Sequence, residues 1–278
     1  LRSDVPLLER LRYLSIVSSN LDEFFEVRCA PHITAVNTQA QGVYNAQDGL
    51  VLLAHAQQLV ARQYAIYNAQ LMPALAQAGI RIASHTERTA AQRRWVQQYF
   101  ARAIQPLLVP VALDPAHPFP QVANKSLNMV VRLKGADAFG RTNAVAIIKL
   151  PKVLPRLVEL PRRIAGRQRV FVTLSSMVRA HIAQLFDGRE VLEAVQFRAT
   201  RNTELLLEED EVDDLRTALR EELAFRPFGQ AVRLEVGSHC SDFLAQHLLR
   251  EFELPEQALF RVDGPVNLVR FAELIDLV

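Results

Sequence analysis

The sequence has few cysteines and histidines, and none of them is spaced as metal ligands usually are. Its 278 residues include two cysteines and seven histidines. Cys29 and Cys240 lie too far apart to form a metal knuckle, and the histidines form no HxxxH or HExxH pair. We therefore predict neither a zinc site nor a disulfide framework. This cysteine usage suits a reducing cytoplasm.

Long apolar runs and glycine-rich loops are also missing. No run reaches the roughly 20 residues needed to span a bilayer, and no signal peptide opens the chain. The ten glycines form neither a Walker loop nor a GxGxxG motif, which excludes a phosphate-cradling loop of that kind. The net charge is only +2 and aromatic residues make up 7%. Charge and composition therefore favour no nucleic-acid partner.

What the sequence does contain is enough apolar material for a sizeable core. Half of the residues are hydrophobic and 22% are charged, which is typical of a folded protein. The length favours two domains or one large one. There is no initiator Met, and residues 271–278 stop inside an amphipathic segment. We expect the chain to be part of a longer protein.

The first 80 residues have the apolar spacing of helices, with intervals of three and four. Asn20 followed by an acid at the third position resembles a capping box, which predicts a new helix over residues 20–27. Asp48 is expected to cap a long helix in which Pro73 bends the last turns and Gly79 ends them. We predict an all-helical bundle over residues 1–80.

After residue 106 the sequence changes to short runs rich in Val and Ile, which predict strands. Helices are expected from the capping box at Thr89, from Ser175 to about residue 186, over 212–225, from Ser241 and from Asn267. Residues 81–278 therefore form a predicted α+β domain with a mixed sheet and flanking helices. The predicted strands cover residues 107–111, 127–133, 144–150, 169–174, 191–199, 231–236 and 258–262.

Four stretches carry a resemblance that spans nearly the whole chain. They are residues 4–25, residues 117–120 with 124–128, residues 197–202 running into the acidic run 208–214, and residues 260–268. Their order and content resemble the bacterial polyphosphate kinase family. The resemblance covers the helical N-terminal domain and the head domain of that family.

The resemblance implies a cytoplasmic, Mg²⁺-dependent enzyme that moves the terminal phosphate of ATP onto inorganic polyphosphate, reversibly with ADP. Members of this family work through a phosphorylated histidine and act as oligomers, commonly dimers. The two catalytic histidines belong to downstream domains that this chain lacks. We therefore assign no catalytic residue and no metal ligand here, and we expect the isolated chain to be inactive.

Asn20 matches the asparagine with which the family contacts the adenine end of ATP. It is also a good helix cap, so two roles remain open for its side chain. An amide offers both a donor and an acceptor, which suits the edge of adenine. Glu26 departs from the family, which often has an apolar residue there, and we expect it to place a charge beside the nucleotide site.

Basic residues are the candidates for holding polyphosphate. Arg198 and Arg201 lie three apart on a predicted strand and should face opposite sides, and we choose Arg201 as the polyphosphate contact. The second candidate is a stretch whose charged residues are all basic except Glu159. It is either a solvated loop or a tract of cations that binds a polyanion. Its cations are Lys149, Lys152, Arg156, Arg162, Arg163, Arg167 and Arg169.

The acid run over residues 208–214 is interpreted as the solvated start of a helix rather than a metal site. None of the seven histidines has a sequence neighbourhood that marks an activated phosphoryl acceptor, and the prolines around His117 predict a rigid turn. One alternative function stays open. The chain could be a non-catalytic module of the same architecture that binds anions or other proteins.

Overall fold

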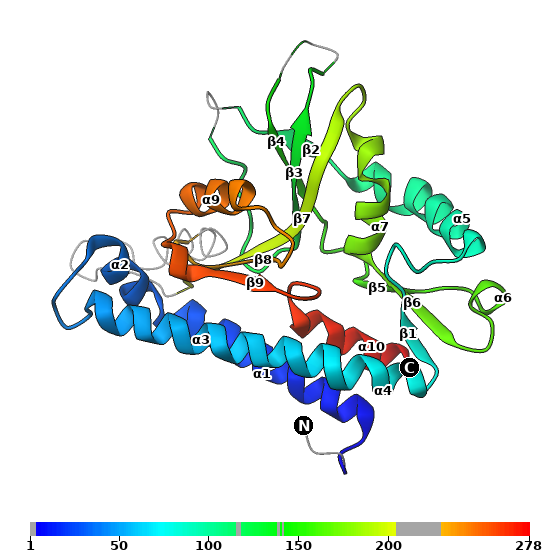
Figure 1. Cartoon of the computed structure of the whole chain (residues 1–278), viewed down its shortest axis with the longest axis horizontal. Helices are drawn as coiled ribbons and strands as arrows, with labels where there is room; N and C mark the ends of the chain where they lie inside the picture. Colours follow the sequence, from blue (N-terminus) through cyan, green and yellow to red (C-terminus); the bar gives the residue numbers. More distant parts are fainter. Residues whose placement is uncertain (1–3, 115–117, 138–139, 141, 204–228) are drawn as a thin grey trace, which may run out of the picture.

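The computed structural model describes residues 4–114, 118–137, 140, 142–203 and 229–278. The N-terminal helices lie along one side of a six-stranded sheet. A smaller three-stranded sheet lies to the right of the six-stranded one in Figure 1. This arrangement confirms the predicted α+β class. In the described ranges, no helix combines the length and the apolarity that crossing a membrane requires.

The N-terminal part is helical, as predicted, but its helices begin at other residues. Asn20 caps nothing, because it lies inside one uninterrupted helix of 22 residues. The long helix that was assigned to Asp48 is capped by Asn45, whose side-chain oxygen accepts from the Asp48 backbone N–H at 2.8 Å. Gly79, with φ of 79°, takes the left-handed conformation expected of it. The helices are α1 (Leu7–Arg28), α2 (Ala30–Thr38), α3 (Ala46–Ile66), a π-helical turn (Tyr67–Leu71) and α4 (Met72–Gln77).

The larger sheet has the order β2-β4-β3-β7-β8-β9. Its neighbours are antiparallel except β8 and β9, which are parallel, so the sheet is mixed as predicted. Helix α9 (Asp242–Glu251) begins at Ser241, the predicted cap, and lies over β8 and β9 (Figure 1). The strands are β2 (Pro110–Ala112), β3 (Asn128–Lys134), β4 (Val145–Lys149), β7 (Glu190–Arg201), β8 (Ala231–Gly237) and β9 (Leu259–Val262).

The smaller sheet has the order β1-β6-β5, and two of its three strands were not predicted. β1 runs parallel to β6, whereas β5 runs antiparallel to it. The capping box at Thr89 is confirmed, but the helix expected from Ser175 is capped two residues earlier, by Thr173. The elements are β1 (Ile80–Ile82), β5 (Leu157–Glu159), β6 (Arg169–Thr173), α5 (Ala90–Tyr99), α6 (Arg162–Ala165) and α7 (Leu174–His181).

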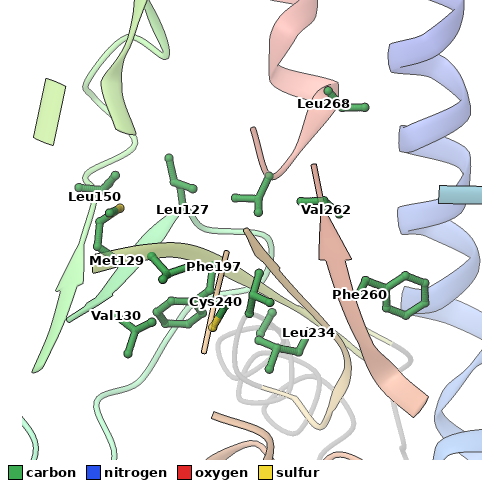
Figure 2. Close-up of a cluster of buried hydrophobic side chains, with 14 of the residues drawn as sticks. Leu127, Met129, Val130, Leu150, Phe197, Leu234, Cys240, Phe260, Val262 and Leu268 are labelled. Carbon is green, nitrogen blue, oxygen red and sulfur yellow. The ribbon is translucent and has the colours of Figure 1, made fainter. Parts of the chain in front are cut away.

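One hydrophobic core joins the helices to the larger sheet. Every residue of β8 is buried, because elements cover both faces of this strand. Figure 2 shows the side chains of β3, β7, β8 and β9 meeting in this core. The rings of Phe25 on α1 and Phe260 on β9 meet edge to face at 5.6 Å. The core crosses residue 80, and the division into domains 1–80 and 81–278 stays a prediction.

One further prediction differs in form from the structure, and three others concern residues outside the described ranges. The helix expected from Asn267 is a 3-10 turn (Leu268–Ala272) followed by α10 (Glu273–Leu277). The helix expected over 212–225, the acid run over 208–214 and His117 lie outside the described residues.

Candidate functional site

Helix α1 is apolar on two faces, one buried and one open to solvent. The buried face contains Leu14, Leu21 and Phe25, which pack into the core. The opposite face carries five large apolar side chains that are 38% to 53% exposed, and we call these the α1 stripe. An exposed apolar surface of this kind marks a site of contact with a ligand or another protein surface. The stripe consists of Tyr13, Ile16, Val17, Phe24 and Val27.

Asn20 lies in the middle of the α1 stripe. It is seven residues from both Tyr13 and Val27 and four from Phe24, spacings that share one face of a helix. The Asn20 side chain is exposed and makes no hydrogen bond to any other residue in the described ranges. Its amide is therefore a free donor and acceptor surrounded by apolar side chains. Such a surface can hold a flat apolar group that has a polar edge.

A groove between α1 and α3 continues the stripe. It encloses about 590 Å³, and its walls are Leu21 and Phe24 from α1 and mainly apolar residues from α3. Val51 and Leu59 of α3 are 46% and 42% exposed, respectively. His55 also lines the groove and is exposed. The open apolar surface around Asn20 thus spans both helices.

Beneath the stripe, α1 is joined to the larger sheet by four charged side chains that are buried together. We call Asp22, Arg198, Arg233 and Glu235 the ion cluster. Arg198 of β7 donates two hydrogen bonds to the Asp22 carboxylate, at 2.7 and 2.8 Å, and a third to Glu235. Arg233 Nη2 lies 2.7 Å from Glu235 Oε1 and 3.3 Å from Asp22 Oδ1. All four are 3% exposed or less.

The ion cluster is electrically balanced, with two positive and two negative charges. Burial by itself would raise the pKa of Glu235, but Arg198 and Arg233 lower it to about 2. For Arg198, burial opposes the charge, and Glu235 and Asp22 overcome it and hold the pKa above its usual range. The Arg233 guanidinium also lies over the Phe25 ring, 5.0 Å from its centroid. These contacts set the rotation of α1 against β7 and β8.

The two arginines of β7 that the sequence singled out have different surroundings. Arg198 belongs to the ion cluster, where Asp22 and Glu235 neutralise its charge. Arg201 is half-buried, and it donates from Nε to the Val122 carbonyl at 2.9 Å and from Nη1 to the Gly229 carbonyl at 2.7 Å. Within the described part of the chain, Arg201 pairs with no carboxylate. Burial lowers its pKa.

Glu26 forms an ion pair within the chain. It lies on the buried side of α1, where its carboxylate meets the Lys125 ammonium at 2.8 Å and accepts from the Asn124 amide. Lys125 neutralises this charge, and the expectation that Glu26 places a charge beside the nucleotide site stays a prediction. The ion pair with Lys125 therefore offsets the charge that Glu26 introduces at this position.

The basic stretch around Glu159 is not one continuous loop. It passes through β5, α6 and the start of β6, and its charges divide into three groups. Arg156 is buried, and Arg169 forms a bidentate pair with Glu159 at 2.7 and 2.9 Å. The remaining cations are exposed: Lys149 ends β4, Arg162 and Arg163 are consecutive in α6, and Lys152 and Arg167 lie in turns.

The resemblance implies Mg²⁺, for which carboxylate oxygens are the usual protein ligands. No group of three His, Cys, Asp or Glu side chains in the described ranges could hold a metal ion. Asp22 and Glu235, the two buried acids of the ion cluster, are already taken up by arginines. The described residues therefore do not fit a Mg²⁺ site on their own.

The ion cluster was not predicted as a unit, although its residues carry a signal in the sequence. Asp22 interrupts the apolar spacing on the buried face of α1. Arg233 and Glu235 alternate with Val232, Leu234 and Val236 in a strand that is otherwise apolar. Charged residues at predicted core positions are almost always paired with each other. Which partners they take depends on tertiary contacts that single-chain spacing does not show.

Family models and curated relatives match both parts of this chain. Residues 1–83 match the family described as the polyphosphate kinase N-terminal domain, and residues 91–274 match the polyphosphate kinase middle domain. The polyphosphate kinase of Xylella fastidiosa strain 9a5c is 46% identical over 100% of this chain, which covers 40% of that protein. The polyphosphate kinase of Neisseria meningitidis serogroup B is 44% identical over 99% of this chain, which covers 41% of that protein.

A solved structure shows the same fold. The crystal structure of polyphosphate kinase from Porphyromonas gingivalis aligns with a TM-score of 0.70 and 24% identity, over 97% of this chain and 37% of that one. The chain spans about 40% of the length of the curated relatives it matches. From the two domain matches and the whole-chain identity, we conclude that this chain belongs to the polyphosphate kinase family and carries its N-terminal and middle domains.

Proposed function

We propose that this chain is the N-terminal part of an enzyme that reversibly transfers the terminal phosphate of ATP to inorganic polyphosphate. The phosphohistidine would be carried by the part of the enzyme that lies outside the 40% of the relatives matched here. This chain would contribute one wall of the nucleotide pocket. The observation that carries the proposal is the exposed Asn20 amide at the centre of the α1 stripe.

The surface around Asn20 has the chemistry that an adenine ring requires. Adenine presents flat apolar faces and an edge with donors and acceptors. Phe24 and Val17 flank Asn20 and offer apolar contact to the ring faces, while the free amide can pair with the edge. The helix places these side chains on one line, so a ligand can touch them at the same time. The remaining walls of such a pocket would come from the rest of the enzyme.

The test is Asn20→Ala in the complete enzyme, with Ser19→Ala as the control. Both residues are exposed in the interior of α1, and Ala favours a helix, so neither change should lower the melting temperature. A lost hydrogen bond of ~0.5–1.5 kcal/mol should raise the KM for ATP by at most about tenfold in Asn20→Ala. Ser19→Ala should leave KM unchanged. An unchanged KM in Asn20→Ala would remove Asn20 from the nucleotide site.

For polyphosphate, we propose Arg201 as a contact. Its charge faces no carboxylate in the described part of the chain, and the Val122 and Gly229 carbonyls hold the side chain in place. A guanidinium that is fixed in this way loses little conformational entropy when it meets a phosphate oxygen. The exposed cations of the basic stretch are more dispersed and remain a second choice.

The proposal also includes a metal ion, an oligomeric state and a cellular compartment. Mg²⁺ would be required with ATP, with ligands from outside the described residues. We propose a homo-oligomer, in the simplest case a dimer, in the cytoplasm. Cys29 and Cys240 are both buried free thiols, which suits a reducing compartment.

A further inference from the structure

A cavity separate from the groove between α1 and α3 has mixed walls, in which apolar side chains such as Ile82, Met129 and Phe271 lie beside polar ones. It encloses about 210 Å³ between the end of β6, the start of α7, the loop after β1 and the loop after β8. At roughly 30 Å³ per water molecule, this volume holds several waters or a small ion with part of its hydration shell. In the described ranges, no residue of α1 lines it.

The walls of this cavity carry an unusual set of polar groups. Five side chains with a hydroxyl line it: Tyr67, Ser84, Thr173, Ser175 and Ser176. Thr173 caps α7, so the N-terminus of that helix, with its partial positive charge, also faces this region. Hydroxyls and a helix N-terminus are groups that bind the oxygens of an anion.

The charged groups on the cavity are cationic or can become so. Arg179 and His239 meet at its rim, with 3.0 Å between Nη1 and Nε2, and His85 lines the same space. No Asp or Glu lines the cavity in the part of the chain that the structure describes. Two carboxylates on neighbouring segments are engaged elsewhere. Glu87 accepts from the Ser84 backbone N–H, and Glu193 accepts from Ser241.

A second arginine lies directly behind the wall. Arg88 is 3% exposed, and its guanidinium donates to the Ser176 hydroxyl. The Nε atom of Arg88 is buried without a hydrogen-bond partner in the described residues. A buried cation without a carboxylate partner is costly, and an anion in front of Ser176 would offset that cost. Through its contact with Ser176, Arg88 adds a second positive charge next to the cavity.

Burial and the nearby positive charges lower the pKa of His85 and of His239. Burial lowers the pKa of His85, and Arg179, Arg88 and His239 lower it further. Burial and Arg179 also lower the pKa of His239, against smaller opposite effects of the Ala194 backbone and Glu193. A bound anion would reverse the effect of the arginines, so both imidazoles would take up protons more readily.

We propose that this cavity binds a phosphoryl oxyanion, either inorganic phosphate or the terminal phosphoryl group of a polyphosphate chain. Arg179 would make the charge-assisted contact at the rim, and the hydroxyls of Ser84, Ser175 and Ser176 would donate to the remaining oxygens. The choice of phosphate chemistry follows from membership of the polyphosphate kinase family. It does not depend on the role of Asn20.

The test is a titration of the 278-residue chain with inorganic phosphate and, separately, with tripolyphosphate, at constant ionic strength set by chloride. The NMR signals of the His85 and His239 rings report binding, and exposed His55 on α3 is the internal control. We expect saturable shifts at His85 and His239, a raised pKa for both rings, and no change at His55. Arg179→Gln should weaken binding by about tenfold or more.

Arg162→Gln is the matched control, because Arg162 is an exposed arginine that does not line the cavity. It should bind as the unchanged chain does. Saturation by inorganic phosphate would identify a site for the free ion, and saturation by tripolyphosphate alone would identify a site for a chain end. If neither ligand shifts His85 and His239 beyond chloride, or if Arg179→Gln binds with unchanged affinity, the proposal is overturned. Both results are independent of the KM measured for Asn20→Ala.

Discussion

The Asp22→Asn variant keeps the shape of the side chain and removes one of the two negative charges of the ion cluster. In the unchanged chain, Asp22 accepts two hydrogen bonds from Arg198 and also lies 3.3 Å from Arg233. The variant leaves two buried guanidinium groups facing Glu235 alone. Because Arg198 and Arg233 are both about 1% exposed, water cannot replace the missing charge.

Removal of one partner from a buried ion pair costs ~3–5 kcal/mol, because the other charge stays buried and uncompensated. We expect the Asp22→Asn variant to lose stability in this range. The control is Glu9→Gln, which breaks the Arg12–Glu9 pair on the first turns of the same helix. Those side chains are 51% and 40% exposed, so this change should cost ~1 kcal/mol or less.

The ion cluster also predicts a dependence on pH. The arginines overcome the effect of burial and hold the pKa of Glu235 at about 2 in the folded chain, against an ordinary value of 4.5. The ionised form is therefore favoured by folding. Its contribution, ~3 kcal/mol, is fully present above pH 4.5 and is lost as the pH falls towards 2. The stability difference between the unchanged chain and Glu235→Gln should shrink over that interval.

The assay is urea denaturation followed by circular dichroism at 222 nm, at pH 7 and at pH 3. At pH 7, Asp22→Asn should unfold at a clearly lower urea concentration than Glu9→Gln, with a similar slope. The reasoning is refuted if the two variants unfold within 1 kcal/mol of each other. It is also refuted if the difference between the unchanged chain and Glu235→Gln does not change between pH 7 and pH 3.

Three further predictions test other parts of the molecule. Burial raises the pKa of the Cys29 and Cys240 thiols to about 12, so a thiol reagent at pH 8 should label neither in the folded chain and both after denaturation. Gly49→Ala would bring a Cβ atom within 2.6 Å of Val36 Cγ2 and should destabilise by ~1–3 kcal/mol in urea melts, whereas Gly42→Ala, with open space around it, should be neutral. The isolated chain, incubated with ATP labelled on its terminal phosphate, should retain no acid-labile phosphate; retained label would place a phosphoryl acceptor in this chain.

The strands of the larger sheet could be predicted because their sequence signal is local. Val130, Val131, Ile147 and Ile148 lie in short β-branched runs, and the structure pairs these runs in one antiparallel ladder. β1 and β5 were missed because each has three residues. Strands this short give almost no periodic signal, and they form because both pair with β6.

The predicted break at Asn20 failed for a different physical reason. A helix cap contributes ~1 kcal/mol, whereas burial of one large apolar side chain contributes ~1.5–3 kcal/mol. Leu21 and Phe25 continue the buried face begun by Leu14, so an unbroken helix buries all of them against the sheet. Tertiary packing therefore outweighs the local preference at Asn20. The same limit applies to Thr173, which caps α7 in place of Ser175.

For the candidate site, the family resemblance suggested Asn20 and strand alternation suggested Arg201, but the surroundings of Arg198 and Arg201 are visible only in the structure. Arg198 and Arg201 are equivalent as residue types, yet Arg198 is neutralised by Asp22 and Glu235 and Arg201 is held by carbonyl groups. Pairing of this kind connects β7 to α1 across 176 positions of sequence. No local pattern in a single sequence encodes such a contact.

Asn20 and Asp22 are two residues apart on α1 and point to nearly opposite sides of it, since each helical residue turns the side chain by about 100°. Apolar burial favours the rotation of α1 that covers Leu14, Leu21 and Phe25, but apolar contacts have no preferred direction and specify the exact orientation less sharply than hydrogen bonds do. The bidentate pair between Arg198 and Asp22 does have a direction, and it fixes which residues of α1 face outwards. The α1 stripe is consequently held in one orientation by charges buried behind it. Stability should therefore respond to Asp22 and nucleotide affinity to Asn20, although both lie within the same turn of helix.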